Sequence, residues 1–506
     1  MPTPTRPNIL IVMLDQLTGL WFPDGPLPFL QVPHLNRLAE RSLRFRNAYT
    51  PSPLCLPARA AFLTGALPSQ TGVYDNAAEV PAHWPTFIHH LRRGGYDTCL
   101  AGKMHFVGPD QLHGFESRLT TDIYPADFGW TPDFRNPEAR IDWWYHNLGS
   151  VADAGIAETS NQLEFDDETA FHAERWLYNR ARRLDPRPWC LTVSFTHPHD
   201  PYVARRRYWR RYDGVEIPPP TVPALPFERH DPHARRLLKA VDHERFALDD
   251  EHIARARRAY AANLSYLDDQ IGRLLSVLDV GGFADDTAIL FCADHGDMLG
   301  ERGLWFKMSF YEGSARVPLM LAAPGLDPGS IETPVSLLDV GPTLLALAGL
   351  DAGPVGVGAG ENLLGIAEGG ERTAAVAMEY AAEGARGPMV ALRDAHFKFV
   401  EAPGDPPQLF DLADDPHEHN NLAADPAHGE RARAFAEQVA QCWDLPAFGR
   451  DVLDSQARRH LVAEALNQGR RTAWDFQPFE DASGRYMRNH LDLNRLEAER
   501  RYPPAD

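Results

Sequence analysis

The chain has 506 residues, a formal net charge of −20, and 44% hydrophobic and 24% charged residues. A chain of this length and composition can form one large core with a smaller appended domain, as ordinary globular proteins do. The acidic balance excludes extensive contact with nucleic acid, because a phosphate backbone requires a basic face on the protein.

The N-terminal segment has no targeting or anchoring pattern. Residues 1–7 lack a basic leader, and the apolar run of residues 8–14 is too short for a signal peptide or a membrane span. We expect a buried parallel strand there and no attachment to a membrane. The cysteines are odd in number and scattered: Cys55, Cys99, Cys190, Cys292 and Cys442. This usage predicts a reducing, cytoplasmic location rather than a disulfide framework.

Short apolar runs alternate with helical patterns along the first three quarters of the chain. The clearest predicted strands are residues 9–14, 190–195, 288–292 and 318–322. Residues 260–278 predict an amphipathic helix, because apolar side chains recur there at helical spacing. The alternation is typical of α/β proteins, so we expect a large mixed, mostly parallel sheet sandwiched by helices.

The pattern changes near residue 375. Residues 390–393, 397–401 and 408–412 predict short antiparallel strands, packed by a helix near residues 426–442. We therefore divide the chain into three parts. They are a catalytic α/β domain (1–374), a small C-terminal α+β subdomain (375–442) and a C-terminal extension (443–506).

The C-terminal extension has little regular apolar period but several aromatic residues. These are Trp474, Phe476, Phe479 and Tyr486. Apolar side chains on a segment without its own core are expected to lie on another surface. We therefore predict that the extension wraps a neighbouring subunit in a homo-oligomer, a dimer or a tetramer.

Polar residues follow several of the predicted strands. Asp15 comes after the first, and Asp294 and His295 come after the third. The carboxyl ends of parallel strands meet at one edge of a sheet, so these side chains can converge. Two carboxylates and one imidazole suit calcium, magnesium or manganese, and Gln16 could add an amide oxygen. The alternative is that the aspartates only cap the helices that follow.

Cys55 stands before a short predicted helix. Pro57 lies in its first turn, residues 58–64 form its body and Gly65 follows its end. A cysteine at a helix N-terminus meets free amides that favour an anion. Arg59, four residues later, returns to the same helix face. The alternative is a buried structural cysteine beside an incidental arginine.

The segment Cys55-x-Pro57-x-Arg59, followed by Ala-Ala-Phe-Leu-Thr-Gly, resembles the activation motif of the sulfatase family in the alkaline phosphatase superfamily. Further similar motifs follow in the family's order. They are residues 8–15, 102–105, 198–199, 265–272 and 293–296, and Lys307. The resemblance implies an alkaline phosphatase-like fold and a hydrolase of small-molecule sulfate esters. It also implies that a formylglycine-generating maturase oxidises Cys55 to formylglycine, whose hydrate is the nucleophile.

The resemblance assigns roles by position. The implied ligands of one divalent metal ion, Ca²⁺ or Mn²⁺, are Asp15, modified Cys55, Asp294 and His295. The implied holders of the sulfate oxygens are Asn76, Lys103 and Lys307, and Arg59 would steady the formylglycine. His105 and His199 would be the proton-transfer pair; His197 is a weaker candidate, because the family's histidine follows the proline. Gln16 and His295 differ from the residues that many family members have at these two positions. This difference leaves the identity of the metal ion open.

Within the family, residues 50–76, 194–202 and 474–490 most resemble the choline sulfatase subgroup. A quaternary ammonium group is recognised by aromatic faces and carboxylates. Residues 124–146 are rich in aromatics, among them Trp143, Trp144 and Tyr145. By resemblance, Trp130 and His146 would line the cation pocket, with Glu383, or else Glu379, as its carboxylate. At least half of the aromatics are expected to be core or subunit contacts.

Three other functions fit parts of the pattern. A phosphonate monoester or phosphodiester hydrolase of the same superfamily would share the modified cysteine and the metal-binding histidine. An arylsulfatase would use the same machinery on phenyl esters. A non-catalytic binding protein could keep the fold, although the intact motif residues argue against it.

Overall fold

The computed structural model describes residues 6–138, 146–182, 185–351, 358, 360–370, 372, 374–471 and 473–504. Its centre is an eight-stranded sheet with the order β12-β2-β11-β9-β1-β7-β4-β5. Four strands form its parallel middle: β4 (Asp97–Gly102), β7 (Trp189–Pro198), β1 (Asn8–Asp15) and β9 (Thr287–Ala293). All residues of β7 and β9, and all but Asn8 in β1, are buried, which explains their continuous apolar sequences.

One side of the sheet contains both antiparallel and parallel strand pairs, and the other side ends in a short strand. The strand β11 (Leu319–Ala322) is antiparallel to both β9 and β2 (Leu43–Phe45), and β12 (Gly329–Ile331) is parallel to β2. At the other edge β5 (Ser117–Arg118) pairs in parallel with β4. The predicted strand 318–322 is therefore present, but it runs against its neighbour.

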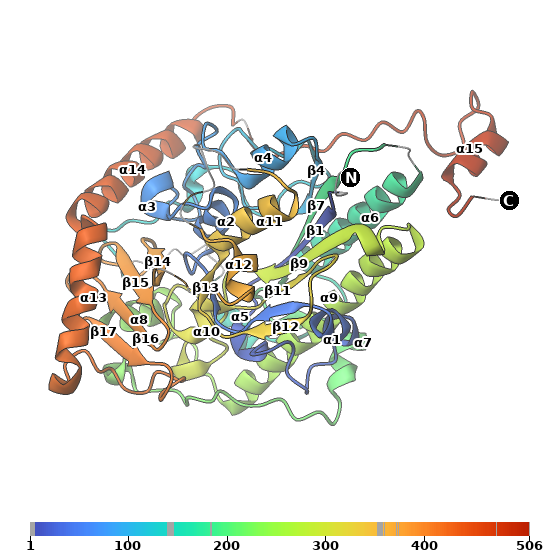
Figure 1. The fold of residues 1–506 in the computed structure, drawn as a ribbon. Helices are drawn as coiled ribbons and strands as arrows, with labels where there is room; N and C mark the ends of the chain where they lie inside the picture. The colour runs from blue at the N-terminus through green and yellow to red at the C-terminus, as the bar shows by residue number, and fades with distance from the viewer. Residues whose placement is uncertain are drawn as a thin grey trace.

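Helices cover both faces of the sheet (Figure 1). The long helices α6 (Asn161–Arg182) and α9 (Asp250–Val280) lie on one face; α2 (Cys55–Thr64), α4 (Phe87–Arg93) and α11 (Val340–Leu347) lie on the other. This confirms the predicted mostly parallel sheet sandwiched by helices. In the described part of the chain, no helix combines the length and the apolar character needed to cross a membrane.

The remaining elements are short. The helices are α1 (Pro33–Glu40), α3 (Pro68–Thr71), α5 (Gly149–Ala152), α7 (Arg206–Trp209), α8 (Pro232–Ala240), α10 (Glu312–Ala315), α12 (Leu363–Ala367) and the 3₁₀ turn η2 (Phe128–Trp130). The strands are β3 (Ala48–Tyr49), β10 (Arg316–Val317) and β13 (Val335–Ser336) in one small sheet, and β6 (Gly155–Ile156) with β8 (Val203–Ala204) in another.

A four-stranded antiparallel sheet follows the main sheet in the chain. Its strands, in order, are β14 (Val376–Tyr380), β15 (Met389–Arg393), β16 (Phe397–Glu401) and β17 (Gln408–Asp411). The helix α13 (Gly429–Cys442) packs against it through Phe435 and Val439. The three predicted strands are present. The sequence did not predict β14, where a buried glutamate, Glu379, interrupts the apolar run.

The C-terminal extension begins with a helix that the sequence analysis did not find. The helix α14 (Leu445–Leu466) has 22 residues and lies along the outer edge of the molecule (Figure 1). Its buried residues are Phe448, Val452, Gln456 and Arg459. Because two of these four residues are polar, the buried face of the helix does not show apolar residues at regular helical spacing.

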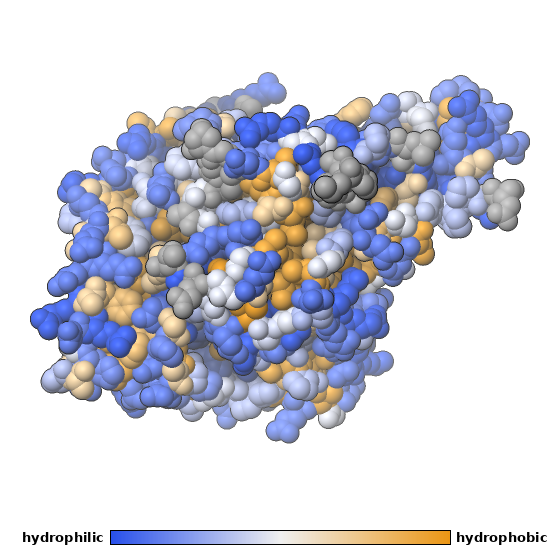
Figure 2. Space-filling model, viewed as in Figure 1, coloured by the Kyte–Doolittle hydropathy of each residue, from blue (hydrophilic) through white to orange (hydrophobic). Residues whose placement is uncertain are grey.

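Beyond α14 the chain first runs along the body, where the ring of Trp474 lies 5.3 Å from that of Phe128 and Asp475 Oδ1 accepts from the backbone N of Ala126 at 3.3 Å. It then leads to α15 (Leu493–Arg500), which forms a separate lobe (Figure 1). Most of the surface in the same view is hydrophilic, in keeping with the net charge of −20 (Figure 2). Several apolar side chains of this segment are exposed. Phe479 is 89% exposed, Met487 77% and Tyr486 61%.

A buried cluster of three charges joins the four-stranded sheet to the main body. Lys398 of β16 has its Nζ 2.7 Å from Glu312 Oε1 of α10 and 2.6 Å from Glu418 Oε1. The same Nζ donates to the Phe310 carbonyl oxygen at 2.6 Å. One lysine therefore faces two carboxylates away from water. Its loss would leave Glu312 with Arg316, 3.4 Å away, and would remove the counter-charge of Glu418.

Replacing Lys398 with methionine should lower the free energy of unfolding by about 3–5 kcal/mol, because two buried carboxylates lose the positive charge of this lysine. Chemical denaturation followed by circular dichroism measures the change. The matched control is Lys239→Met, which removes an exposed ion pair with Glu138, 2.9 Å apart. The control should lose far less stability. An equal loss in the two variants would contradict the role given to Lys398.

Candidate active site

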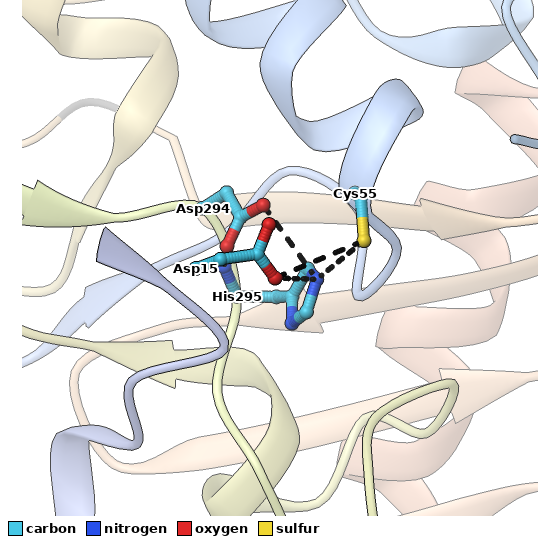
Figure 3. Close-up of side chains that lie close together, drawn as sticks. All are labelled: Asp15, Cys55, Asp294 and His295. Carbon is cyan, nitrogen blue, oxygen red and sulfur yellow. Dashed lines mark hydrogen bonds and ion pairs between the residues drawn. The ribbon is translucent and has the colours of Figure 1, made fainter. Parts of the chain in front are cut away.

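Four side chains that could ligate a metal converge at the carboxyl edge of the main sheet. Asp15 ends β1, while Asp294 and His295 follow β9 directly, and β1 and β9 are neighbours. Cys55 is the first residue of α2 and points at them (Figure 3). The four ligand atoms lie within 4.8 Å of one another, and all four residues are buried. Two carboxylates, one imidazole and a fourth donor fit a divalent ion.

The Cys55 side chain lies in a strongly cationic environment. Its Sγ is 3.2 Å from His295 Nε2 and 4.0 Å from Asp15 Oδ1 (Figure 3). Burial alone would raise the pKa of the thiol, but Lys103, Lys307 and His295 together hold it well below its ordinary value. The helix predicted after Cys55 is present, and Gly65 ends it in the left-handed conformation with φ 65°.

Arg59 joins the strand ends to the helix that carries Cys55. It donates from Nη2 to Asp15 Oδ2 and from Nε to Asp294 Oδ2, each at 2.8 Å. Its Nη1 donates to the Lys103 carbonyl oxygen, also at 2.8 Å. The guanidinium is fully buried, and its contacts hold the two aspartates and fix α2 against the sheet.

Two buried lysines approach this group. Lys103 follows β4 and donates from Nζ to Asp15 Oδ2, while its Nζ lies 4.1 Å from the centre of the Tyr124 ring. Lys307 donates to Gln16 Oε1 at 2.7 Å and lies 2.7 Å from His199 Nε2. Both ammonium groups lower the pKa of Cys55. They therefore form a positively charged surface beside its sulfur, suited to an anionic ester.

The three candidate histidines lie in different surroundings. His199 has Nδ1 2.7 Å from the Asp200 carbonyl oxygen and Nε2 beside Lys307, so its Nδ1 donates and its Nε2 accepts. His105 lies next to Cys55, and its burial lowers the pKa of its ring. His197 instead has Nδ1 2.6 Å from Asp166 Oδ2 of α6. The structure thus brings His105 and His199, but not His197, into the group around Cys55.

The amide oxygen of Gln16 does not point towards the four side chains that could bind a metal. That oxygen accepts from Lys307, and its Nε2 donates to Asp297 Oδ2 at 2.8 Å and to Asp200 Oδ1 at 3.2 Å. Tyr202 Oη also donates to Asp297 Oδ2 at 2.8 Å. Burial raises the pKa of Asp297 to about 6. This network holds Gln16 in place, and Gln16 in turn positions Lys307.

His146 and Trp130 lie beside the two candidate proton-transfer histidines. The ring of His146 is 4.9 Å from that of His199, and burial lowers its pKa to about 4, so it is neutral near pH 7. Trp130 has its ring 5.9 Å from His105 and 5.1 Å from Tyr124. A cleft of about 790 Å³ lies beside Tyr124 and Trp130. Trp143, Trp144 and Tyr145, also expected there, lie outside the described residues.

The two candidate glutamates differ in their contacts. Glu379 accepts from the backbone N and Oγ of Ser69 at 2.7 and 2.6 Å, and from Trp443 Nε1 at 2.6 Å. Those bonds occupy its carboxylate. Burial raises the pKa of Glu383 to about 7, and the charges of Lys307 and Cys55 also act on this carboxyl group. The Oε2 of Glu383, in contrast, is buried without a hydrogen-bond partner among the described residues, so its carboxyl group is the one of the two that is not occupied by such bonds.

Asn76 lies at the start of α2, where its Oδ1 accepts from the backbone N of Leu56 at 3.0 Å. It is thus next to Cys55, as the sequence predicted for a residue near the reacting group. The sequence analysis missed Asp297 and Asp200, although each stands two residues or fewer from a predicted site residue. It also missed Asp122, which accepts from the backbone N of His105 at 2.8 Å.

Comparisons with known proteins agree with this geometry. A family model described as "Sulfatase" matches residues 7–350, and one described as "Choline sulfatase enzyme C terminal" matches residues 450–502. A third, "N-sulphoglucosamine sulphohydrolase, C-terminal", matches residues 300–444.

Curated relatives include a choline-sulfatase of Rhizobium meliloti, 57% identical over 100% of both chains. The multifunctional alkaline phosphatase superfamily protein PehA of Trinickia caryophylli is 29% identical over 87% of this chain and 96% of its own. The phosphonate monoester hydrolase SpPMH of Silicibacter pomeroyi shares the fold, with a TM-score of 0.68, 24% identity, and coverage of 86% of this chain and 94% of that one. The chain therefore belongs to the sulfatase family and is a sulfuric ester hydrolase, as the Cys55 motif predicted.

Proposed function

We propose that this enzyme hydrolyses choline sulfate to choline and sulfate. The observation that carries the proposal is that the rings of Trp130 and His146 lie 5.9 and 4.9 Å from those of His105 and His199. The Glu383 carboxyl group, on which the charge of Cys55 acts, supports it. A quaternary ammonium group donates no hydrogen bond, so it is bound by such rings and charges. The relation to the choline-sulfatase of Rhizobium meliloti, over the full length of both chains, supports the same substrate.

We further propose that Asp15, Cys55, Asp294 and His295 hold one divalent ion, Ca²⁺ or Mn²⁺. The close approach of their four ligand atoms supports this. The imidazole ligand is compatible with manganese as well as with calcium. A bound ion supplies Lewis-acid chemistry, which lowers the pKa of an oxygen nucleophile. That oxygen would be a hydroxyl group of the hydrated formylglycine, which forms when a maturase has oxidised Cys55 to the aldehyde and water has added to it.

In this proposal the other buried groups divide the remaining work. Lys103, Lys307 and Asn76 hold the sulfate oxygens, and the two ammonium groups neutralise the charge that develops there. In its imidazolium form, protonated at Nε2 as well as at Nδ1, His199 would give the Nε2 proton to the departing alcohol oxygen; in the present structure Lys307 donates to that nitrogen. His105 accepts a proton from the nucleophile. Arg59 keeps Cys55 aligned with the metal-binding aspartates.

Assembly and location complete the proposal. The exposed apolar residues of the C-terminal segment support a homo-oligomer, a dimer or tetramer, in which a second subunit covers them. They are Phe479, Tyr486, Met487 and Leu493. All cysteines are free thiols, and Cys55, Cys99, Cys190 and Cys292 are buried as such, which supports a reducing, cytoplasmic location.

Steady-state turnover of several esters tests the substrate proposal. We expect kcat/KM for choline sulfate to exceed that for nitrophenyl sulfate and for a nitrophenyl phosphodiester by roughly 10²-fold or more, because only choline carries a cation for the pocket. A preference for the phosphodiester would assign the enzyme to phosphonate monoester or phosphodiester hydrolysis, and a preference for the phenyl ester would assign it to the arylsulfatases.

Expression together with a formylglycine-generating maturase should convert Cys55, so that its tryptic peptide becomes lighter than the cysteine form in mass spectrometry. Activity should rise in proportion to the converted fraction, since the modified residue is the nucleophile. Cys55→Ala should lower kcat by roughly 10⁴-fold or more. The control is Cys442→Ala, at an exposed cysteine outside the site, which should keep full activity. Full activity of a wholly unconverted preparation would refute the assignment.

The preference for a cation should depend on pH through Glu383. With its pKa raised to about 7, this carboxyl is uncharged well below that pH and becomes a carboxylate above it. We expect kcat/KM for choline sulfate, divided by that for dimethylbutyl sulfate, its isostere without the positive charge, to rise roughly tenfold from pH ~6 to ~8. The Glu383→Gln variant should show a low, flat ratio. A wild-type ratio that does not change over this range would count against Glu383 as the cation's partner.

A further inference from the structure

The buried face of α14 is the starting point. Phe448 and Val452 pack among apolar residues, and Phe448 lies 5.6 Å, ring to ring, from Tyr74. One and two turns further on, the same face carries Gln456 and Arg459, 2% and 6% exposed. Buried polar side chains of this size are retained only where they have defined partners. Their partners lie in two loops that border the site.

Arg459 makes a bidentate ion pair with Asp75. Its Nη1 and Nη2 donate to Asp75 Oδ1 and Oδ2 at 2.6 and 2.7 Å, and its Nη1 is also 3.2 Å from Thr131 Oγ1. The side chain of Arg459 is 7% exposed and that of Asp75 is not exposed. The fork geometry and the burial make this contact both strong and directional. One guanidinium thus joins residue 75 to residue 131.

The first loop leads to the nucleophile. Asp75 precedes Asn76, whose Oδ1 accepts from the backbone N of Leu56, the residue after Cys55. Asp75 Oδ1 also accepts from the backbone N of Ala77 at 3.0 Å, so the carboxylate shapes its own loop. A movement of Asp75 would therefore be passed to Asn76 and to the first turn of α2.

The second loop carries Trp130. Thr131 follows it and donates from Oγ1 to the Phe128 carbonyl oxygen at 2.8 Å. Further along, the backbone N of Phe134 donates to Gln456 Oε1 at 3.0 Å. Two residues of α14, Arg459 and Gln456, therefore hold the loop directly after Trp130, and the tryptophan's position depends on the helix.

The charge of Arg459 also matters for the site. Asp75 is close enough to Glu383 that its negative charge raises the pKa of that carboxyl. The guanidinium group of Arg459 is hydrogen-bonded to Asp75 and neutralises this negative charge. Without it, an uncompensated Asp75 would oppose the ionisation of Glu383 more strongly.

We propose that Arg459 is a positioning residue that sets selectivity for the alcohol half of the substrate, by fixing Trp130 relative to Cys55 and Glu383 through Asp75 and Thr131. This inference rests on the proposed choline sulfate hydrolysis. It gives α14 a function in substrate choice, although no residue of α14 is among those gathered around Cys55.

The test compares choline sulfate with ethyl sulfate, which lacks the trimethylammonium group but keeps the sulfate and both carbons. Both esters are assayed on the same preparation, so the ratio of their kcat/KM values does not depend on the folded fraction. Arg459→Met should lower this ratio by at least about tenfold, chiefly through KM for choline sulfate. The control Arg458→Met, at an exposed neighbour on the same helix, should leave it unchanged.

A second variant, Arg459→Met with Asp75→Asn, removes the uncompensated buried carboxylate and so restores stability. It still lacks the tie to Thr131, and its ratio should remain low. An unchanged ratio in Arg459→Met, or in the double variant if the single one does not fold, would show that the ion pair is only structural. Restoration of the ratio in the double variant would overturn the positioning role as well, since charge alone would then explain the loss. If the wild type does not prefer choline sulfate, the proposed function fails instead.

Discussion

The active site depends on burying two carboxylates side by side. Asp15 and Asp294 end neighbouring strands of the central sheet and are no more than 1% exposed. Such a pair is stable only with compensating positive charge. Arg59 donates to both, and Lys103 donates to Asp15. Because Arg59 lies one turn after Cys55 in α2, the bonds that compensate the aspartates also fix the position of Cys55, the proposed source of the nucleophile.

The same constraint explains why so much of the site could be predicted from sequence. Apolar runs such as residues 9–14 predict buried parallel strands, and the polar residues after them must then meet at one sheet edge. Pro57 and Gly65 mark the helix of Cys55 at both ends. The placement of Asp15, Asp294 and His295 therefore follows from local patterns together with one topological rule, whereas their meeting with Cys55 was implied by the resemblance to the sulfatase motif.

Other features depend on contacts between distant segments, which local patterns do not encode. Glu379 and Glu383 are four residues apart, and only the bonds of Glu379 to Ser69 and Trp443 show which of the two carboxylates is already occupied. The pairing of Arg459 with Asp75 spans 384 residues. The helix that carries Arg459 was missed for the same reason: its inner face is polar where it contacts the site loops, so its period is not an apolar one.

The groups proposed to act on the sulfate ester and those proposed to select its alcohol thus come from different parts of the fold. Asp15, Cys55, Asp294 and His295 lie on strand ends and one helix start, all within the segment 7–350 that matches the sulfatase model. The groups that we propose bind the alcohol lie on loops and on the turn after β14. The helix α14 fastens one of those loops, and most of this helix lies in the segment that matches a separate C-terminal model. Loops and terminal helices can change without disturbing a buried charge network. A family built in this way can therefore alter the alcohol that it accepts while it keeps the chemistry of the sulfate ester.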